Sequence, residues 1–123
     1  MFWEKTTGEK REYERYKVSN DVSVMLRNGF IECGQLINIS KDGLALSYIS
    51  NVKRIKGWFH IYLFSRDQFF LIDIPFRVIS DFLIEDMTLF NTMIKKQCGG
   101  QFGELTNQQQ SDLDYFIANH TMG

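Results

Sequence analysis

The chain has 123 residues, a length that we expect to fold as one domain. Its 44% hydrophobic and 24% charged residues provide enough apolar side chains for a core, which excludes an intrinsically disordered chain. Fourteen Lys and Arg against fifteen Asp and Glu give a net charge of −1, so the chain lacks the broad positive field that attracts long nucleic acids.

The sequence carries no sign of export or membrane insertion. Its longest apolar run is far shorter than the roughly 20 residues that span a bilayer, and its N-terminus, MFWEKTTGEKRE, lacks the apolar centre of a signal peptide. We therefore expect a cytoplasmic protein. In that reducing compartment Cys33 and Cys98 are expected to be buried free thiols rather than a disulfide.

The first predicted elements are an arm and a hairpin. Residues 1–17 are polar and carry interleaved charges of both signs, which predicts a flexible N-terminal arm before a single domain over residues 18–123. From residue 18 to 27 apolar and polar residues alternate, as in a half-buried strand. Asn28 and Gly29 then predict a tight turn into a second strand over residues 30–39, where Gly34 suggests a bulge or barrel corner.

The middle of the chain predicts three more strands. Lys41-Asp42-Gly43 is a turn signal, and Leu44, Leu46 and Tyr48 alternate after it. A basic loop over residues 50–57, with Lys53, Arg54 and Lys56, is expected to be solvated. Strands are then predicted at 58–64 and 69–81, with Pro75 indicating an edge or a bulge because proline cannot donate to a ladder.

The last third ends in a helix. Residues 82–92 fit no single pattern. A core role, with an exposed docking patch as the alternative, is expected for the apolar side chains in and next to this region: Phe82, Leu83, Met87, Leu89, Phe90 and Met93. A final strand is predicted over residues 93–102. Thr106 and Gln109 have the spacing of a capping box, and Leu113, Phe116, Ile117 and His120 form one helical stripe. The fold expected is mainly β, with about six antiparallel strands and a C-terminal helix.

Two short motifs carry the functional hypothesis. Arg11 and Arg15 are separated by three residues in the arm, and Asn38, Ser40 and Gly43 surround the turn between the second and third strands. Arginine presents a planar fork that binds phosphate oxygens or the edge of guanine. The amide of Asn38 and the hydroxyl of Ser40 can bind a base edge, while Gly43 is expected to allow positive φ and close approach of a ligand.

Together the motifs resemble the PilZ family, which is defined by Arg-x-x-x-Arg followed by Asp or Asn-x-Ser-x-x-Gly. The segment Cys98-Gly99-Gly100-Gln101-Phe102 and the helix after it look like the family's last strand and closing helix. The resemblance implies a six-stranded antiparallel β-barrel that binds cyclic di-GMP without catalysis or cofactor. It assigns ligand contacts to Arg11, Arg15, Asn38, Ser40 and Gly43, and it suggests that Lys10 influences whether one or two ligand molecules are held.

The expected mechanism is ordering of the arm on ligand binding, with the signal passed to a separate effector. The resemblance alone implies flagellar, pilus, secretion or polysaccharide machinery as the effector. The alternative is a PilZ-like barrel that binds no nucleotide and acts as a constitutive interaction module. A barrel that binds single-stranded nucleic acid is a weaker third hypothesis, because the charge balance argues against it.

Other site types have less support. The five residues His60, His120, Cys33, Cys98 and Asp73 lack the short spacings of a zinc site, so no metal is expected. Glu85 and Asp86 are adjacent acids, which predict an exposed turn more than an acid/base pair.

Overall fold

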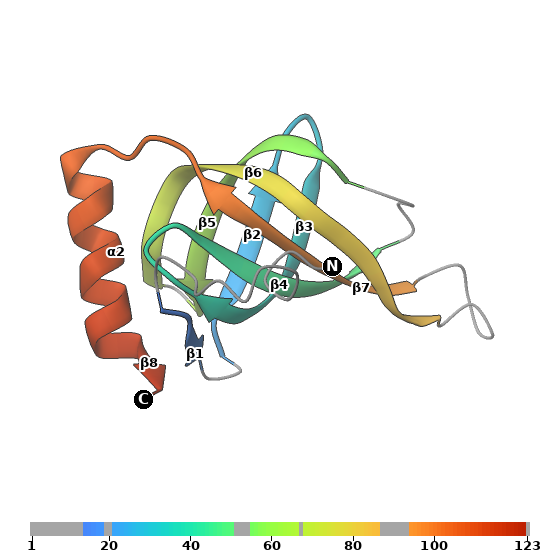
Figure 1. Ribbon diagram of the computed structural model, residues 1–123, viewed down its shortest axis with the longest axis horizontal. Helices are drawn as coiled ribbons and strands as arrows, with labels where there is room; N and C mark the ends of the chain where they lie inside the picture. The colour runs from blue at the N-terminus through green and yellow to red at the C-terminus, as the bar shows by residue number, and fades with distance from the viewer. Residues whose placement is uncertain (1–13, 19–20, 51–54, 67, 87–93, 123) are drawn as a thin grey trace, which may run out of the picture.

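The computed structural model describes residues 14–18, 21–50, 55–66, 68–86 and 94–122. Six of its strands form a closed antiparallel barrel: β2 (Ser23–Arg27), β3 (Ile31–Ile39), β4 (Gly43–Ser50), β5 (Gly57–Ser65), β6 (Gln68–Asp86) and β7 (Ile94–Phe102). The order around the barrel is β2-β5-β6-β7-β4-β3, and pairing of β2 with β3 closes it (Figure 1). The predicted fold class is confirmed.

Two short strands extend the sheet next to β3. β1 (Tyr16–Val18) pairs with β3 at Asn38 and Ile39, beyond the part of β3 that pairs with β2. β8 (Thr121–Met122) pairs with the other edge of β1 and directly follows helix α2 (Asn107–His120). The expected arm over residues 1–17 lies mostly outside the described residues, but its last two positions belong to β1.

The barrel interior is filled by the alternating residues that the sequence pattern indicated. Val24, Leu26, Leu44, Leu46 and Ile61 are fully buried, and Leu113 and Phe116 of α2 pack on the same core. The predicted capping box is present, since Thr106 accepts from the Gln109 N–H at 3.1 Å and the Gln109 side chain accepts from the Thr106 N–H at 2.9 Å. Gln109 also donates to the Asp73 carbonyl at 3.0 Å, which ties the start of α2 to β6.

The predictions of strand irregularities at Gly34 and Pro75 have different outcomes. Gly34 is not a bulge, because the shift in β3 falls between Leu36 and Asn38. A Cβ at Gly34 would lie 2.1 Å from the Ser47 carbonyl oxygen, so close approach of β4 explains the glycine. Pro75 pairs with His60 of β5 but lies one residue outside the ladder with β7, which begins at Phe76, as expected for a residue that cannot donate; its carbonyl accepts from the Gly103 N–H. The irregularity in this part of β6 accompanies Asp73, which has φ 58°.

The region after residue 81 also differs from expectation. β6 continues to Asp86, so Glu85 and Asp86 belong to a strand paired with β7 instead of a turn. Phe82 and Leu83 are 49% and 54% exposed, which contradicts the core role expected for them. Phe82 pairs with Gln97 of β7 and Leu83 pairs with Lys96, in the last part of β6. Met87, Leu89, Phe90 and Met93 lie outside the described residues, as do Lys53 and Arg54 of the basic loop.

The two thiols differ in environment. Cys98 is buried on β7, as expected, whereas Cys33 on β3 is exposed, and neither forms a disulfide. The described residues include no group of three or more His, Cys, Asp or Glu side chains that could hold a metal ion. Among those residues no helix is long and apolar enough to cross a membrane.

Candidate functional site

The turn between β3 and β4 presents the second motif. β3 ends at Ile39 and β4 begins at Gly43, and the Ser40 N–H donates to the Gly43 carbonyl at 2.9 Å. The Ser40 hydroxyl donates to the Asp42 carboxylate at 2.5 Å and accepts from the Asp42 N–H at 3.3 Å. Ser40 is 1% exposed, so in this structure its hydroxyl holds the turn together.

Gly43 is required for a reason that differs from the one expected. Its φ does not lie in the left-handed region, where Gly29 and Gly57 are found. A Cβ at Gly43 would instead lie 2.1 Å from the Gly100 carbonyl oxygen of β7. The glycine therefore allows β4 and β7 to approach closely, and the expectation of positive φ is wrong.

Asn38 joins the two motifs. It is half-buried on β3, where it pairs with Ala45 of β4 on one side and with Lys17 of β1 on the other. Its side-chain Oδ1 accepts a hydrogen bond of 3.1 Å from Nη1 of Arg15, the residue immediately before β1. The sequence predicted that these residues serve one site, and the structure places them in direct contact. Arg11 and Lys10 lie outside the described residues.

The surface beside Asn38 consists of small side chains. Cross-strand pairing places Asn38, Ala45, Gly99 and Ser80 in one row on the outside of β3, β4, β7 and β6. Ala45 is buried and Gly99 is half-buried, so the row places no bulky side chain next to the Arg15–Asn38 pair. Sequence reasoning missed Ala45 and Ser80, although the consecutive glycines Gly99 and Gly100 inside a predicted strand were a signal of close approach.

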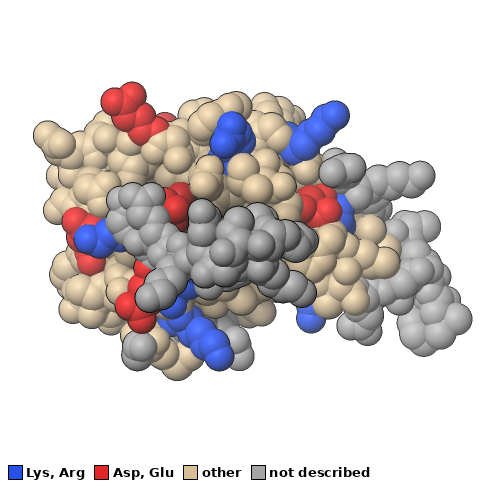
Figure 2. Space-filling model, viewed as in Figure 1, with Lys and Arg blue, Asp and Glu red and all other residues tan. Residues whose placement is uncertain are grey.

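Charged side chains of both signs lie on the described surface of the molecule. Figure 2 shows Lys and Arg side chains interspersed with Asp and Glu over the face that it presents. Any recognition of an anion there depends on individual side chains such as Arg15, because mixed charges produce no broad positive field.

A buried polar cluster lies inside the same strands. Asp81 of β6 accepts hydrogen bonds from the Lys96 ammonium at 2.5 Å, the Tyr48 hydroxyl at 2.5 Å and the Ile55 N–H at 2.9 Å. Burial and the neighbouring Asp81 carboxylate raise the pKa of the Tyr48 hydroxyl, and they raise the pKa of the Cys98 thiol to about 12. The cluster joins β4, β6 and β7 to Ile55, two residues before β5, and no sequence pattern indicated it.

The sequence profile of the PilZ domain matches residues 9–119 of the chain. No curated protein matches the sequence. Among solved structures, the chain is similar to the PilZ domain with c-di-GMP of YcgR from Escherichia coli, with 12% identity and a TM-score of 0.71 over 91% of this chain and 92% of that one.

Two longer proteins contain a similar fold. One is the inhibitor of motility MotI/DgrA from Bacillus subtilis, with 18% identity and a TM-score of 0.64 over 89% of this chain and 51% of that one. The other is MrkH of K. pneumonia in complex with c-di-GMP, with 16% identity and a TM-score of 0.63 over 90% of this chain and 52% of that one. The chain thus spans about half of each of these two proteins, and at such identities the likeness shows the fold.

Proposed function

Because this chain belongs to the PilZ domain family, we propose that it is a receptor for cyclic di-GMP that acts by binding and carries out no chemistry of its own. The observation that carries the proposal is the hydrogen bond between Arg15 and Asn38, which unites the two motifs at one place on the barrel. The similar structures of YcgR and MrkH contain c-di-GMP, which supports the same ligand here.

The ligand would lie on the outer surface of β3, β4 and β7. Arg15 supplies a guanidinium for a phosphate or a guanine edge, and the Nδ2 group of Asn38 adds a donor beside it. The small row formed by Ala45 and Gly99 gives a planar base room to approach the sheet. The family motif assigns Arg11 to the site. Lys10, the residue just before it, is proposed to influence whether one or two ligand molecules bind. Ser40 and Gly43 shape the turn that holds Asn38.

Signalling is proposed to proceed through the N-terminal arm to a separate effector. β1 begins one residue after Arg15 and pairs with both β3 and β8, so a ligand that holds Arg15 also acts on the strand that follows α2. Ordering of residues 10–15 over the barrel would create a surface that the ligand-free protein lacks. The effector belongs to flagellar, pilus, secretion or polysaccharide machinery by family resemblance.

Isothermal titration with cyclic di-GMP tests the proposal. The native protein and the Arg27→Gln variant, whose substitution lies opposite Ile31 at the other end of β3 from Asn38, should bind equally, whereas Asn38→Ala should bind more weakly. The number of molecules bound, compared between the native protein and Lys10→Leu, tests the role of Lys10. Absence of binding by the native protein would favour the alternative, a PilZ barrel that acts as a constitutive interaction module.

A further inference from the structure

β2, β5 and the part of β6 that pairs with β5 form a second outer surface, which meets the start of β3 at Ile31, whereas Asn38 lies near the end of β3. Strand register places Arg27 of β2 opposite His60 of β5, and Trp58 of β5 opposite Arg77 of β6. Leu26, Ile61 and Phe76, which alternate with these residues along the strands, are fully buried. Because successive side chains of a strand point to opposite faces, the four paired residues face solvent. We name this surface the β5 face and define it by these residues: Arg27, Ile31, Trp58, His60, Tyr62 and Arg77.

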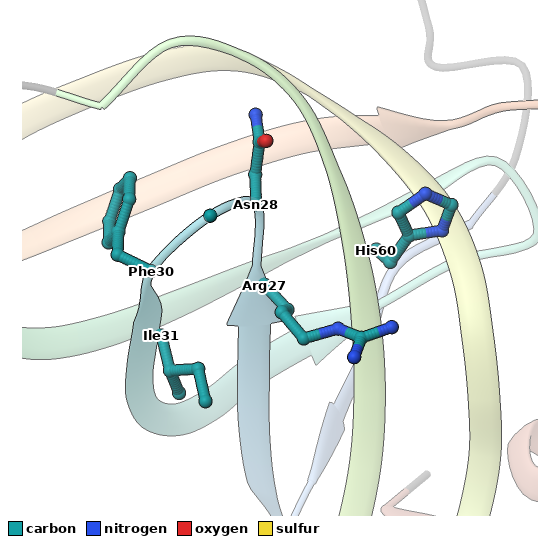
Figure 3. Close-up of a pocket in the computed structure, with 6 residues that line it drawn as sticks. Arg27, Asn28, Phe30, Ile31 and His60 are labelled. Carbon is teal, nitrogen blue, oxygen red and sulfur yellow. The ribbon is translucent and has the colours of Figure 1, made fainter.

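Large apolar side chains are exposed on the β5 face and around it. Trp58 is 53% exposed and Ile31 is 57% exposed, and Phe30 beside them packs its ring edge-on against the buried Phe59. An open depression of about 660 Å³ lies between the β2–β3 turn and β5, lined by Arg27, Asn28, Gly29, Phe30, Ile31 and His60 (Figure 3). Contiguous exposed apolar groups around a depression are typical of interaction surfaces.

The charges of the β5 face are positioned by aromatic rings. The Arg27 guanidinium lies 5.7 Å from the centre of the Tyr62 ring, and the Arg77 guanidinium lies 6.0 Å from the centre of the Trp58 ring. Asp73, the acidic residue of this region, binds His60 at 3.0 Å and accepts from Tyr62 at 3.4 Å. Within the described part of the chain neither arginine has a carboxylate partner, so the β5 face retains two oriented positive charges.

The outward-facing residues of the β5 face have the composition of a protein interface. They include Trp58, Tyr62, Arg27 and Arg77, and neither Lys nor Glu is among them. The centres of protein interfaces are enriched in the first group and depleted in the second. We propose that the β5 face docks a partner protein through a segment in which carboxylates alternate with large apolar side chains.

Charge complementarity selects this occupant. Carboxylates of the partner would pair with Arg27 and Arg77, and an apolar side chain beside them would fill the depression lined by Phe30 and Ile31. A symmetric pair of β5 faces would bring these arginines of two copies to one interface, where like charges repel. The docking does not require nucleotide, so it goes beyond the proposed function.

Selection from a phage-displayed library of random short peptides tests the proposal. The immobilised native protein should enrich peptides in which Asp or Glu adjoins an aromatic or branched aliphatic residue. In a Trp3→Phe background, where Trp58 is the remaining tryptophan, these peptides should change its fluorescence. Arg27→Gln/Arg77→Gln should weaken peptide binding at least about tenfold, because it removes both charge partners. Lys41→Gln/Lys95→Gln removes as much charge elsewhere and should bind like the native protein.

Four results would overturn the proposal: no enrichment, enriched peptides without acidic residues, equal binding by Arg27→Gln/Arg77→Gln, or self-association that this variant abolishes. Binding of oligo(dT) in place of peptides, with a change in Trp58 fluorescence, would show a nucleic-acid surface instead. Titration with cyclic di-GMP separates the two functions. Asn38→Ala should lose nucleotide and keep the peptides, whereas Arg27→Gln, which lies opposite Ile31 and His60, should weaken peptide binding and keep the nucleotide.

Discussion

The Arg15 guanidinium donates a 3.1 Å hydrogen bond to the side chain of Asn38, which lies 23 residues further along the chain. This contact follows from strand pairing. β1 begins at Tyr16, directly after Arg15, and its register places Lys17 opposite Asn38. The second arginine of the motif is therefore held at the barrel wall by backbone pairing as well as by its side chain.

Removal of the Arg15 side chain should weaken binding of cyclic di-GMP. Loss of a hydrogen bond to a charged group costs about 1.5–3 kcal/mol, which corresponds to roughly 10-fold to 150-fold in the dissociation constant. Arg15→Ala and Arg11→Ala should each show a change of this size in isothermal titration, and Arg27→Gln serves as the arginine control. If both alanine variants titrate like the native protein, these arginines do not contact the ligand.

Hydrogen exchange should separate the arm from β1. Amides of residues 10–15 are expected to gain protection when cyclic di-GMP is added, because this polar segment has few apolar groups to hold it without a ligand. The described pairing of Tyr16–Val18 with β3 and β8 predicts that β1 amides exchange slowly in both states. Equal exchange of residues 10–15 with and without ligand would rule out ordering of the arm and leave binding intact.

The sequence predicted the strands best where burial alternates. The pattern at Val22, Val24 and Leu26 identified β2, and the Thr106–Gln109 spacing identified the start of α2, because both signals are local. β1 and β8 were not predicted because each is short and depends on pairing with distant residues: β1 pairs with β3 and β8, and β8 pairs with β1. The exposure of Phe82 and Cys33 also could not be predicted from residue type: Cys33 pairs with Met25 on the outer side of β3, and Phe82 follows the buried side chain of Asp81 in β6.

The role of Gly43 could not be predicted from its own turn, because the atom that excludes a side chain belongs to Gly100 on another strand. Gly43→Ala should lower the free energy of unfolding by about 1–3 kcal/mol, as overpacking does in other cores. Gly99→Ala is the control: its Cβ would meet the Ser80 side chain at 3.1 Å and backbone only at 3.9 Å, so it should cost less. Urea denaturation of the three proteins measures the difference, and equal midpoints would contradict the steric argument.

The buried pair of Lys96 and Asp81 should matter to stability more than to binding. Lys96→Met leaves the Asp81 carboxylate buried with only neutral donors, from Tyr48 and Ile55, and should cost about 3–5 kcal/mol. Asp81→Asn/Lys96→Met removes both charges and should recover most of that loss. The neighbouring Lys95→Met should change stability by about 0.5 kcal/mol or less. Urea denaturation at neutral pH checks all three variants, and a double variant no more stable than Lys96→Met would refute the electrostatic explanation.

Alkaline pH should destabilise the protein through Cys98. Burial, followed by the nearby Asp81 carboxylate, raises the pKa of its thiol from 9.0 to about 12 in the folded state. The unfolded chain therefore releases this proton first. The stabilisation is fully present below pH 9 and is lost as the pH rises towards 12, by at most about 1.4 kcal/mol per pH unit.

Comparison of two cysteine variants isolates this effect. Between pH 8.5 and 10, under reducing conditions, Cys98→Ala should lose less unfolding free energy than the native protein, each measured relative to its own value at pH 7. Cys33→Ala removes an exposed thiol and should keep the steep dependence of the native protein. The pKa of Tyr48 is also raised, by burial first and then by its hydrogen bond to Asp81, but all three proteins share that group. Parallel profiles for Cys98→Ala and Cys33→Ala would therefore show that burial of the Cys98 thiol does not cause the alkaline instability.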